Sequence, residues 1–257
     1  MSTQLIGAIC EGGKKIVLLS DRLVSRAGLA FERGAKGEKI AENAMVLTAG
    51  TVHEPELIEE ARDALQAISR PPILSIAEKL VEKYQDIRLA RIEAEILRAR
   101  GFDSIANYYG RQKALHDALV FEINSTIETY DLGVHILLGG VDSQAHLYYI
   151  CNPGTYSSFD AIGFFCPGMG KEQAESTFVW YEFTPDLSIR ETLYIAFEAK
   201  KKAETAGQVG KATDAWLIDE RGIHDISQET IEELNRIYSS RQALPRFGKE
   251  VTDLQIP

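Results

Sequence analysis

Two small hydroxyl residues, Ser2 and Thr3, stand near the amino terminus of the sequence, directly before the apolar run Leu5–Cys10. The hydroxyl of an N-terminal Ser or Thr can act as a nucleophile, and the α-amine of the same residue can serve as its base. A nucleophile of this kind needs a rigid element behind it. Ser2 and Thr3 are therefore candidates for nucleophilic chemistry at the edge of a strand.

The residues that follow predict strands. Leu5–Cys10 and residues 16–19 are apolar at almost every position, which is typical of strands covered on both faces. The Glu11-Gly12-Gly13 turn between them predicts a hairpin. Residues 44–48 predict a third strand that ends before Gly50, and residues 29–33 predict a weaker one.

A helical block follows, from residue 54 to about residue 128. Apolar residues recur there with the 3.6-residue period of an amphipathic helix, and Pro71-Pro72 interrupts it. Strands and helices then return in short groups. The expected strands are His135–Val141, 146–150, 159–166, 213–218 and 223–226, and the expected helices are 171–183, 188–206 and Gln228–Gln242.

Blocks of like elements, rather than strict alternation of strand and helix, indicate the α+β class with mostly antiparallel sheets. Two groups of strands that are apolar on both faces, together with two groups of helices, predict a four-layer αββα sandwich. We expect one domain over residues 1–257, with an enlarged helical block at about 54–128. A helical and irregular C-terminal extension is expected from about residue 228.

Composition restricts the function. The chain has 257 residues and a net charge of −10, which disfavours a surface for nucleic acids or anionic membranes. No apolar run approaches the roughly 20 residues of a membrane span, and the first run is too short for a signal peptide. We therefore expect a cytoplasmic protein without nucleic-acid or membrane partners.

Cysteine and histidine spacing argues against a metal framework. The three cysteines, Cys10, Cys151 and Cys166, have unrelated spacings, and the first and last lie in apolar runs. Cys10 and Cys166 are expected to be buried thiols, in a protein of the reducing cytoplasm. The five histidines are not at metal-ligand spacing, so no metal site is expected.

Short motifs spread along the chain carry a family resemblance. They are Ile6-Gly7, Asp21-Arg22, Ala49-Gly50, Gly139-Gly140-Val141-Asp142, Pro153-Gly154, Gly168-Met169-Gly170, an alanine- and lysine-rich helix at 191–203, and Gly210-Lys211. In this order and spacing, over roughly residues 3–219, the chain resembles the proteasome-type N-terminal-nucleophile hydrolases.

The resemblance implies roles for residues near the amino terminus. In that family an N-terminal threonine, or serine in relatives, attacks an amide carbonyl, and its α-amine, with a reference pKa near ~8, is the base. Asp21 matches the aspartate that holds the catalytic lysine. Ungapped counting back from Gly50 makes Lys36 that lysine, with Lys39 as the alternative if the loop carries gaps. The Gly50 N–H matches the oxyanion donor.

The position of the nucleophile is left open between two residues. Counting back from Gly7 favours Thr3, whereas removal of Met1 alone would expose Ser2. A free amine on Thr3 therefore needs one further cleavage. Two features depart from active members of the family: Met169 stands where they usually have serine, and residues 206–208 lack their acidic residue.

The resemblance implies a peptidase or amidase of the threonine-protease type that acts through an acyl-enzyme ester without a cofactor. Its substrate would be a peptide or another amide, and transfer to an amine instead of water is compatible with this chemistry. The implied partners are further copies of the chain, in an oligomer or ring, and an ATPase. The alternative is a non-catalytic structural subunit of the same fold, and a third hypothesis is a regulator that binds a small amide without turnover.

Overall fold

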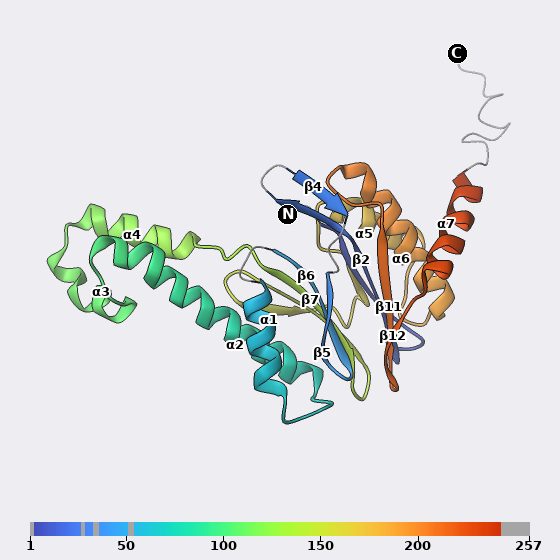
Figure 1. Cartoon of the computed structure of the whole chain (residues 1–257), viewed down its shortest axis with the longest axis horizontal. Coiled ribbons are helices and arrows are strands. Elements are labelled where there is room, and N and C mark those ends of the chain that lie inside the picture. The colour runs from blue at the N-terminus through green and yellow to red at the C-terminus, as the bar shows by residue number, and fades with distance from the viewer. Residues whose placement is uncertain (1–2, 27–28, 33–35, 51–53, 243–257) are drawn as a thin grey trace, which may run out of the picture.

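The computed structural model describes residues 3–26, 29–32, 36–50 and 54–242 (Figure 1). Two five-stranded antiparallel sheets form its centre. The first has the order β10-β1-β2-β11-β12, with β10 Phe164–Phe165, β1 Leu5–Cys10, β2 Lys15–Asp21, β11 Thr213–Asp219 and β12 Gly222–Asp225. The second has the order β5-β6-β7-β8-β9, with β5 Gly37–Ala41, β6 Ala44–Ala49, β7 His135–Val141, β8 Ala145–Cys151 and β9 Thr155–Ser158. The strands β3 Leu23–Arg26 and β4 Leu29–Glu32 form a separate hairpin.

Helices cover both sheets and form an additional arm. The helices beside the sheets are α1 Glu54–Leu65, α2 Ile73–Arg91, α5 Lys171–Trp180, α6 Ile189–Ala203, the short η4 Glu204–Ala206 and α7 Gln228–Gln242. The arm contains η1 Ile92–Leu97, η2 Arg98–Arg100, α3 Ile105–Arg111, η3 Gln112–Ala114 and α4 Asp117–Thr129. The α+β class with antiparallel sheets, predicted from the sequence, is confirmed. No helix in the described ranges combines the length and apolar character needed to cross a membrane.

Alternation along β1 explains the layers. Leu5 and Ile9 lie in the cluster between the two sheets, whereas Ile6, Ala8 and Cys10 lie in the cluster under α5 and α6. Because both faces of the strand are covered, every position is apolar. Burial of each large apolar side chain stabilises the folded state by about 1.5–3 kcal/mol.

The second sheet follows the same rule. Leu47 and Leu137 face the first sheet, whereas Val46 and Leu138 pack against α1 and α2. Figure 1 shows these two helices on one side of the paired sheets and α5–α7 on the other. The arrangement is compatible with the layered sandwich that the sequence predicts.

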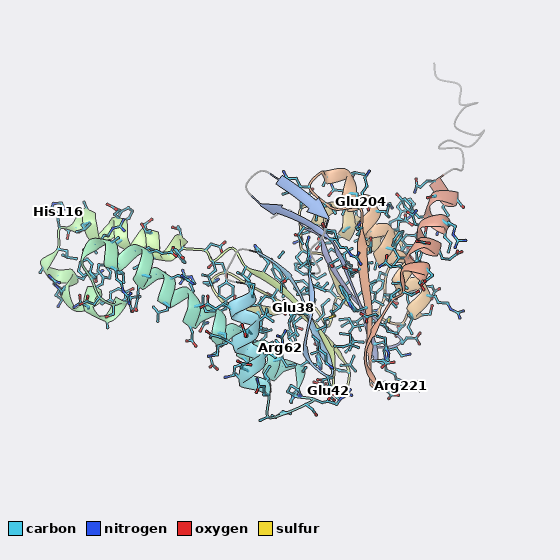
Figure 2. The ribbon with its side chains drawn as sticks, viewed as in Figure 1. Glu38, Glu42, Arg62, His116, Glu204 and Arg221 are labelled. Atoms are coloured by element: carbon cyan, nitrogen blue, oxygen red, sulfur yellow. The ribbon has the colours of Figure 1, made fainter. Side chains whose placement is uncertain are left out.

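The arm leaves the sheets at the end of α2. Its own apolar cluster contains Ile96, Tyr108 and Ile123, which are separate from the core over the second sheet. In Figure 1 the arm projects away from the sheets, and Figure 2 places His116 at its far end. Arg88 joins the two sides of the arm at its base, because its guanidinium donates to the carbonyls of Ile127 and Tyr130.

The single strand expected over residues 159–166 is wrong. Gly163, at φ +82°, donates to the Phe159 carbonyl and closes a turn inside this run. The backbone therefore pairs before the turn, in β9, and again only at Phe164–Phe165 in β10. The apolar residues in between are not a mark of extended backbone here.

Candidate active site

Thr3, Lys36 and Asp21 form a buried chain of polar contacts. The Lys36 Nζ lies 2.7 Å from the Thr3 Oγ1 and 2.6 Å from the Asp21 Oδ1. Thr3 is 6% exposed, Lys36 7% and Asp21 0%. An ion pair between Lys36 and Asp21 at such burial is only weakly screened by solvent. A cation is thus held directly against a threonine hydroxyl.

Asp21 ends β2, and each of its carboxylate oxygens accepts two hydrogen bonds. Oδ1 accepts from the Gln4 N–H at 2.9 Å and from Lys36, and Oδ2 accepts from the N–H groups of Leu23 at 3.1 Å and Gly210 at 2.8 Å. Charge-assisted hydrogen bonds are stronger than neutral ones, so the carboxylate is held in one orientation. Asp21 therefore joins β1, the β2–β3 connection and the segment before β11.

Lys36 lies directly before β5, and β6 fixes its backbone. Its carbonyl accepts a hydrogen bond of 2.9 Å from the Thr48 N–H. Lys39, the alternative lysine, is exposed on β5, and Figure 2 shows Glu38 and Arg62 in this part of the molecule, where they form an ion pair. Of the two candidates, the structure brings Lys36 to Thr3.

The main chain of Thr3 is held by the loop before α5. Its carbonyl accepts a hydrogen bond of 3.0 Å from the Met169 N–H, and a β-carbon on Gly168 would lie 2.4 Å from that carbonyl oxygen. Ser2, the other candidate nucleophile, lies outside the described residues.

Gln4 is a site residue that the sequence analysis missed. Its side chain is fully buried, donates to the Cys166 carbonyl at 3.0 Å and accepts from the Gly170 N–H at 3.0 Å. It thereby joins the start of β1 to the loop before α5. The signal in the sequence was a polar residue directly before the buried strand.

The two departures from the family pattern have different surroundings. The Met169 side chain is 42% exposed, and its backbone N–H holds Thr3. Near residues 206–208, Glu204 pairs with Lys200 at 2.7 Å and Lys201 at 2.8 Å. Figure 2 places Glu204 at the end of the molecule where the β3–β4 hairpin lies.

Gly50, the candidate oxyanion donor, follows β6 and is exposed. A β-carbon there would lie 3.0 Å from the Gly133 carbonyl oxygen and 3.0 Å from the Val134 Cα. The backbone of Gly50 is thus packed closely against the segment that enters β7. Its role as a donor stays a prediction.

A cavity of about 340 Å³ adjoins the segment that holds Thr3. We call it the Met169 pocket, and it is lined by His135, Tyr149, Phe165, Pro167, Gly168, Met169 and Lys171. His135 Nδ1 lies 2.6 Å from the Tyr149 hydroxyl, and burial lowers the pKa of His135. A larger cavity, of about 720 Å³, is lined mainly by α6 and α7.

The cysteines predicted to be buried, Cys10 and Cys166, are buried, and burial raises the pKa of the Cys10 thiol to about 12. Within the described ranges, no three His, Cys, Asp or Glu side chains come close enough together to hold a metal ion. No family model matches this sequence, and no curated protein shows significant similarity to it.

Proposed function

We propose that this chain is a proteasome-related N-terminal-nucleophile hydrolase, a peptidase or amidase in which Thr3 forms an acyl-enzyme ester. The observation that carries the proposal is the position of Lys36 Nζ between the Thr3 hydroxyl and the Asp21 carboxylate. The two sheets and their helices would then be the αββα sandwich of that family.

The proposal requires cleavage of the peptide bond between Ser2 and Thr3, which frees the α-amine of Thr3. The Thr3 hydroxyl, rather than that of Ser2, is assigned as the nucleophile because it contacts Lys36. Removal of Met1 alone would leave Ser2 in front of it and the amine of Thr3 in a peptide bond.

In the first half-reaction the freed amine takes the proton of the Thr3 hydroxyl, directly or through a water molecule. Oγ1 forms a bond to the amide carbon. The Lys36 cation stabilises the partial negative charge that develops on Oγ1 as its proton leaves. The Gly50 N–H is proposed to bind the oxyanion. The carbon–nitrogen bond then breaks, the leaving amine takes the proton, and a Thr3 ester remains.

In the second half-reaction water attacks the ester and gives up a proton to the same amine. The ester bond breaks, Oγ1 recovers its proton and a carboxylic acid leaves. An amine in place of water would restore an amide bond, so the same residues support transfer as well as hydrolysis. Asp21 acts by holding the Lys36 cation in place throughout.

Intact mass spectrometry of the purified chain, followed by a β-lactone probe, tests the proposal. We expect a mass that corresponds to a chain beginning at Thr3 and one covalent label per chain. Labelling should be lost in Thr3→Ala and retained in Thr3→Ser. Met1 retained on every molecule, or labelling that survives Thr3→Ala, would overturn it.

A second candidate function is a non-catalytic subunit of a homo-oligomer. It is favoured because Met169 stands where active members of the family usually have serine, and because Glu204, the acidic residue near 206–208, is already paired with Lys200. Light scattering separates the two proposals together with the probe. A ring of copies that never reacts with the probe supports the structural subunit. Labelling supports the enzyme whatever the size of the assembly, and co-purification with an ATPase would identify the proposed partner.

A further inference from the structure

We propose that the Met169 pocket is a substrate subsite that takes one large apolar side chain, with aromatic residues preferred and basic residues rejected. The inference rests on the proposed function for its position next to a scissile amide. It adds what the substrate must contain beside that amide.

The pocket adjoins the nucleophile through its backbone. Its Pro167-Gly168-Met169 wall is the segment that holds the start of β1: Pro167 accepts from the Leu5 N–H, and Met169 donates to the Thr3 carbonyl. From the second sheet, His135 of the pocket pairs with Ala49, the residue before Gly50. A substrate carbonyl placed between Thr3 and Gly50 would therefore have this pocket beside it.

The walls of the pocket are aromatic and already packed. The rings of Phe165 and Tyr149 meet edge to face with centroids 5.0 Å apart, and Phe159 stacks on Phe165 at 3.8 Å. Tyr149 directs its hydroxyl to His135. Preformed apolar walls and few available polar groups are the usual features of a site for an apolar ligand group.

The size of the pocket suits one side chain. A volume of about 340 Å³ is at the small end of ligand cavities, which excludes a dinucleotide and accommodates an aromatic ring. The half-exposed Met169 forms a wall with a flexible thioether, which adapts to rings of different shape and contacts them favourably.

Charge explains the rejection of basic residues. Lys171 Nζ lies 5.0 Å from the centroid of the Phe165 ring and is the one formal cation among the seven residues that line the pocket. None of these seven is acidic. Glu175 lies 3.9 Å from Lys171 on the helix α5 and is partly exposed. A lysine or arginine side chain would lose its hydration there and meet a like charge.

Peptide binding to a catalytically silent chain tests the subsite. The chain carries Thr3→Ala. The probes are capped alanine hexapeptides in which one Phe or one Lys occupies each of the six positions in turn, and their affinities are measured by calorimetry. We expect a Phe peptide to bind about tenfold or more tightly than its Lys counterpart at one position. Met169→Trp should fill the pocket and remove the preference, and Lys171→Glu should reduce the discrimination against Lys.

The control is Leu74→Trp, because Leu74 is also 42% exposed but lies on α2, outside the pocket. It should leave the preference unchanged, and thermal melting should show all variants folded. Absence of peptide binding, or a Phe preference that survives Met169→Trp, overturns the subsite. A Phe preference in a chain whose wild type never reacts with the β-lactone supports the subsite and overturns the hydrolase.

Discussion

The backbone N–H of Gly210 donates a hydrogen bond of 2.8 Å to Oδ2 of Asp21, across 189 positions of sequence. A β-carbon at Gly210 would lie 3.0 Å from that same oxygen and 2.9 Å from the Leu23 nitrogen, so this approach depends on glycine. Because the other carboxylate oxygen holds Lys36, the segment before β11 helps to fix the cation at Thr3.

Replacement of Asp21 by Asn should leave Lys36 as a buried cation without its carboxylate. Removal of one partner from a buried ion pair costs about 3–5 kcal/mol, so urea denaturation should show a large loss in the free energy of unfolding. The rate of β-lactone labelling should fall as well. Asp214→Asn is the control, because its partner Arg22 is 38% exposed and can be hydrated when the carboxylate is lost, so the loss of stability should be smaller. Equal losses in the two variants would contradict a special role for Asp21.

Lys200 should act on the site through the Gly210 segment. It is fully buried and donates 2.7 Å hydrogen bonds to the Lys211 carbonyl and to Glu204, and burial lowers its pKa. Lys200→Met removes the support for the Lys211 carbonyl, so we expect labelling to slow about threefold to tenfold. Because Lys200→Met removes one partner of a buried ion pair, the melting temperature should fall as well, although Lys201 still pairs with Glu204 at 2.8 Å.

The control for Lys200→Met is Lys201→Met. Lys201 pairs with the same Glu204, at 2.8 Å, but lies partly exposed on the helix. Its loss should leave the labelling rate unchanged. If the two variants slow labelling equally, the effect comes from Glu204 and not from the Lys211 carbonyl.

Gly168→Ala should displace Thr3. The new β-carbon would lie 2.4 Å from the Thr3 carbonyl oxygen, and the φ of +150° is unfavourable for any residue with a side chain. We expect a loss of stability of about 1–3 kcal/mol and much slower labelling. Gly110→Ala is the matched control: its β-carbon would meet nothing within 4 Å, and alanine in α3 should stabilise by about 0.5–1 kcal/mol. Unchanged labelling in Gly168→Ala would show that Thr3 is not held as described.

Local pattern predicted the strands and helices with the strongest signals. Leu5–Cys10 and Gln228–Gln242 have the bounds expected from the sequence. The first is a continuous apolar run and the second has the period of a helix, so neither pattern is ambiguous. β3 and β5 were missed, since each is only four or five residues long and neither is continuously apolar. The turn at Gly163 was hidden inside an apolar run.

Residues that meet only in three dimensions were beyond the sequence. Spacing could not decide between Lys36 and Lys39. The decision depends on how the chain before β5 pairs with β6, because this pairing brings the Lys36 side chain to Thr3. The Met169 pocket draws His135 and Tyr149 from the second sheet and Phe165 from the first. No local period relates these residues, so their proximity follows from the packing of the two sheets.

The arm should be dispensable for the fold of the sheets. Its cluster around Tyr108 is separate from the core under α2, and Arg88 brings the two ends of the arm together. Replacement of residues 93–127 by a short Gly-Ser linker should shift the melting temperature by only a few degrees and leave Thr3 labelling intact. Circular dichroism and the β-lactone test this. A chain that no longer folds would show that the arm stabilises the sandwich.

His135 should make the protein less stable in mild acid. Burial lowers the pKa of His135 from 6.5, and Asp131 opposes this only in part. Below about pH 6.5 the unfolded chain therefore binds a proton that the folded chain rejects, so the free energy of unfolding falls as the pH drops toward the folded pKa. Urea denaturation between pH 7.5 and 5.5 should show this loss in the wild type, and the loss should be smaller in His135→Asn. Tyr149→Phe separates titration from hydrogen bonding, because it removes the partner of His135 but leaves the imidazole buried. That variant should keep the pH dependence, and an identical pH dependence in His135→Asn and the wild type would contradict the assignment.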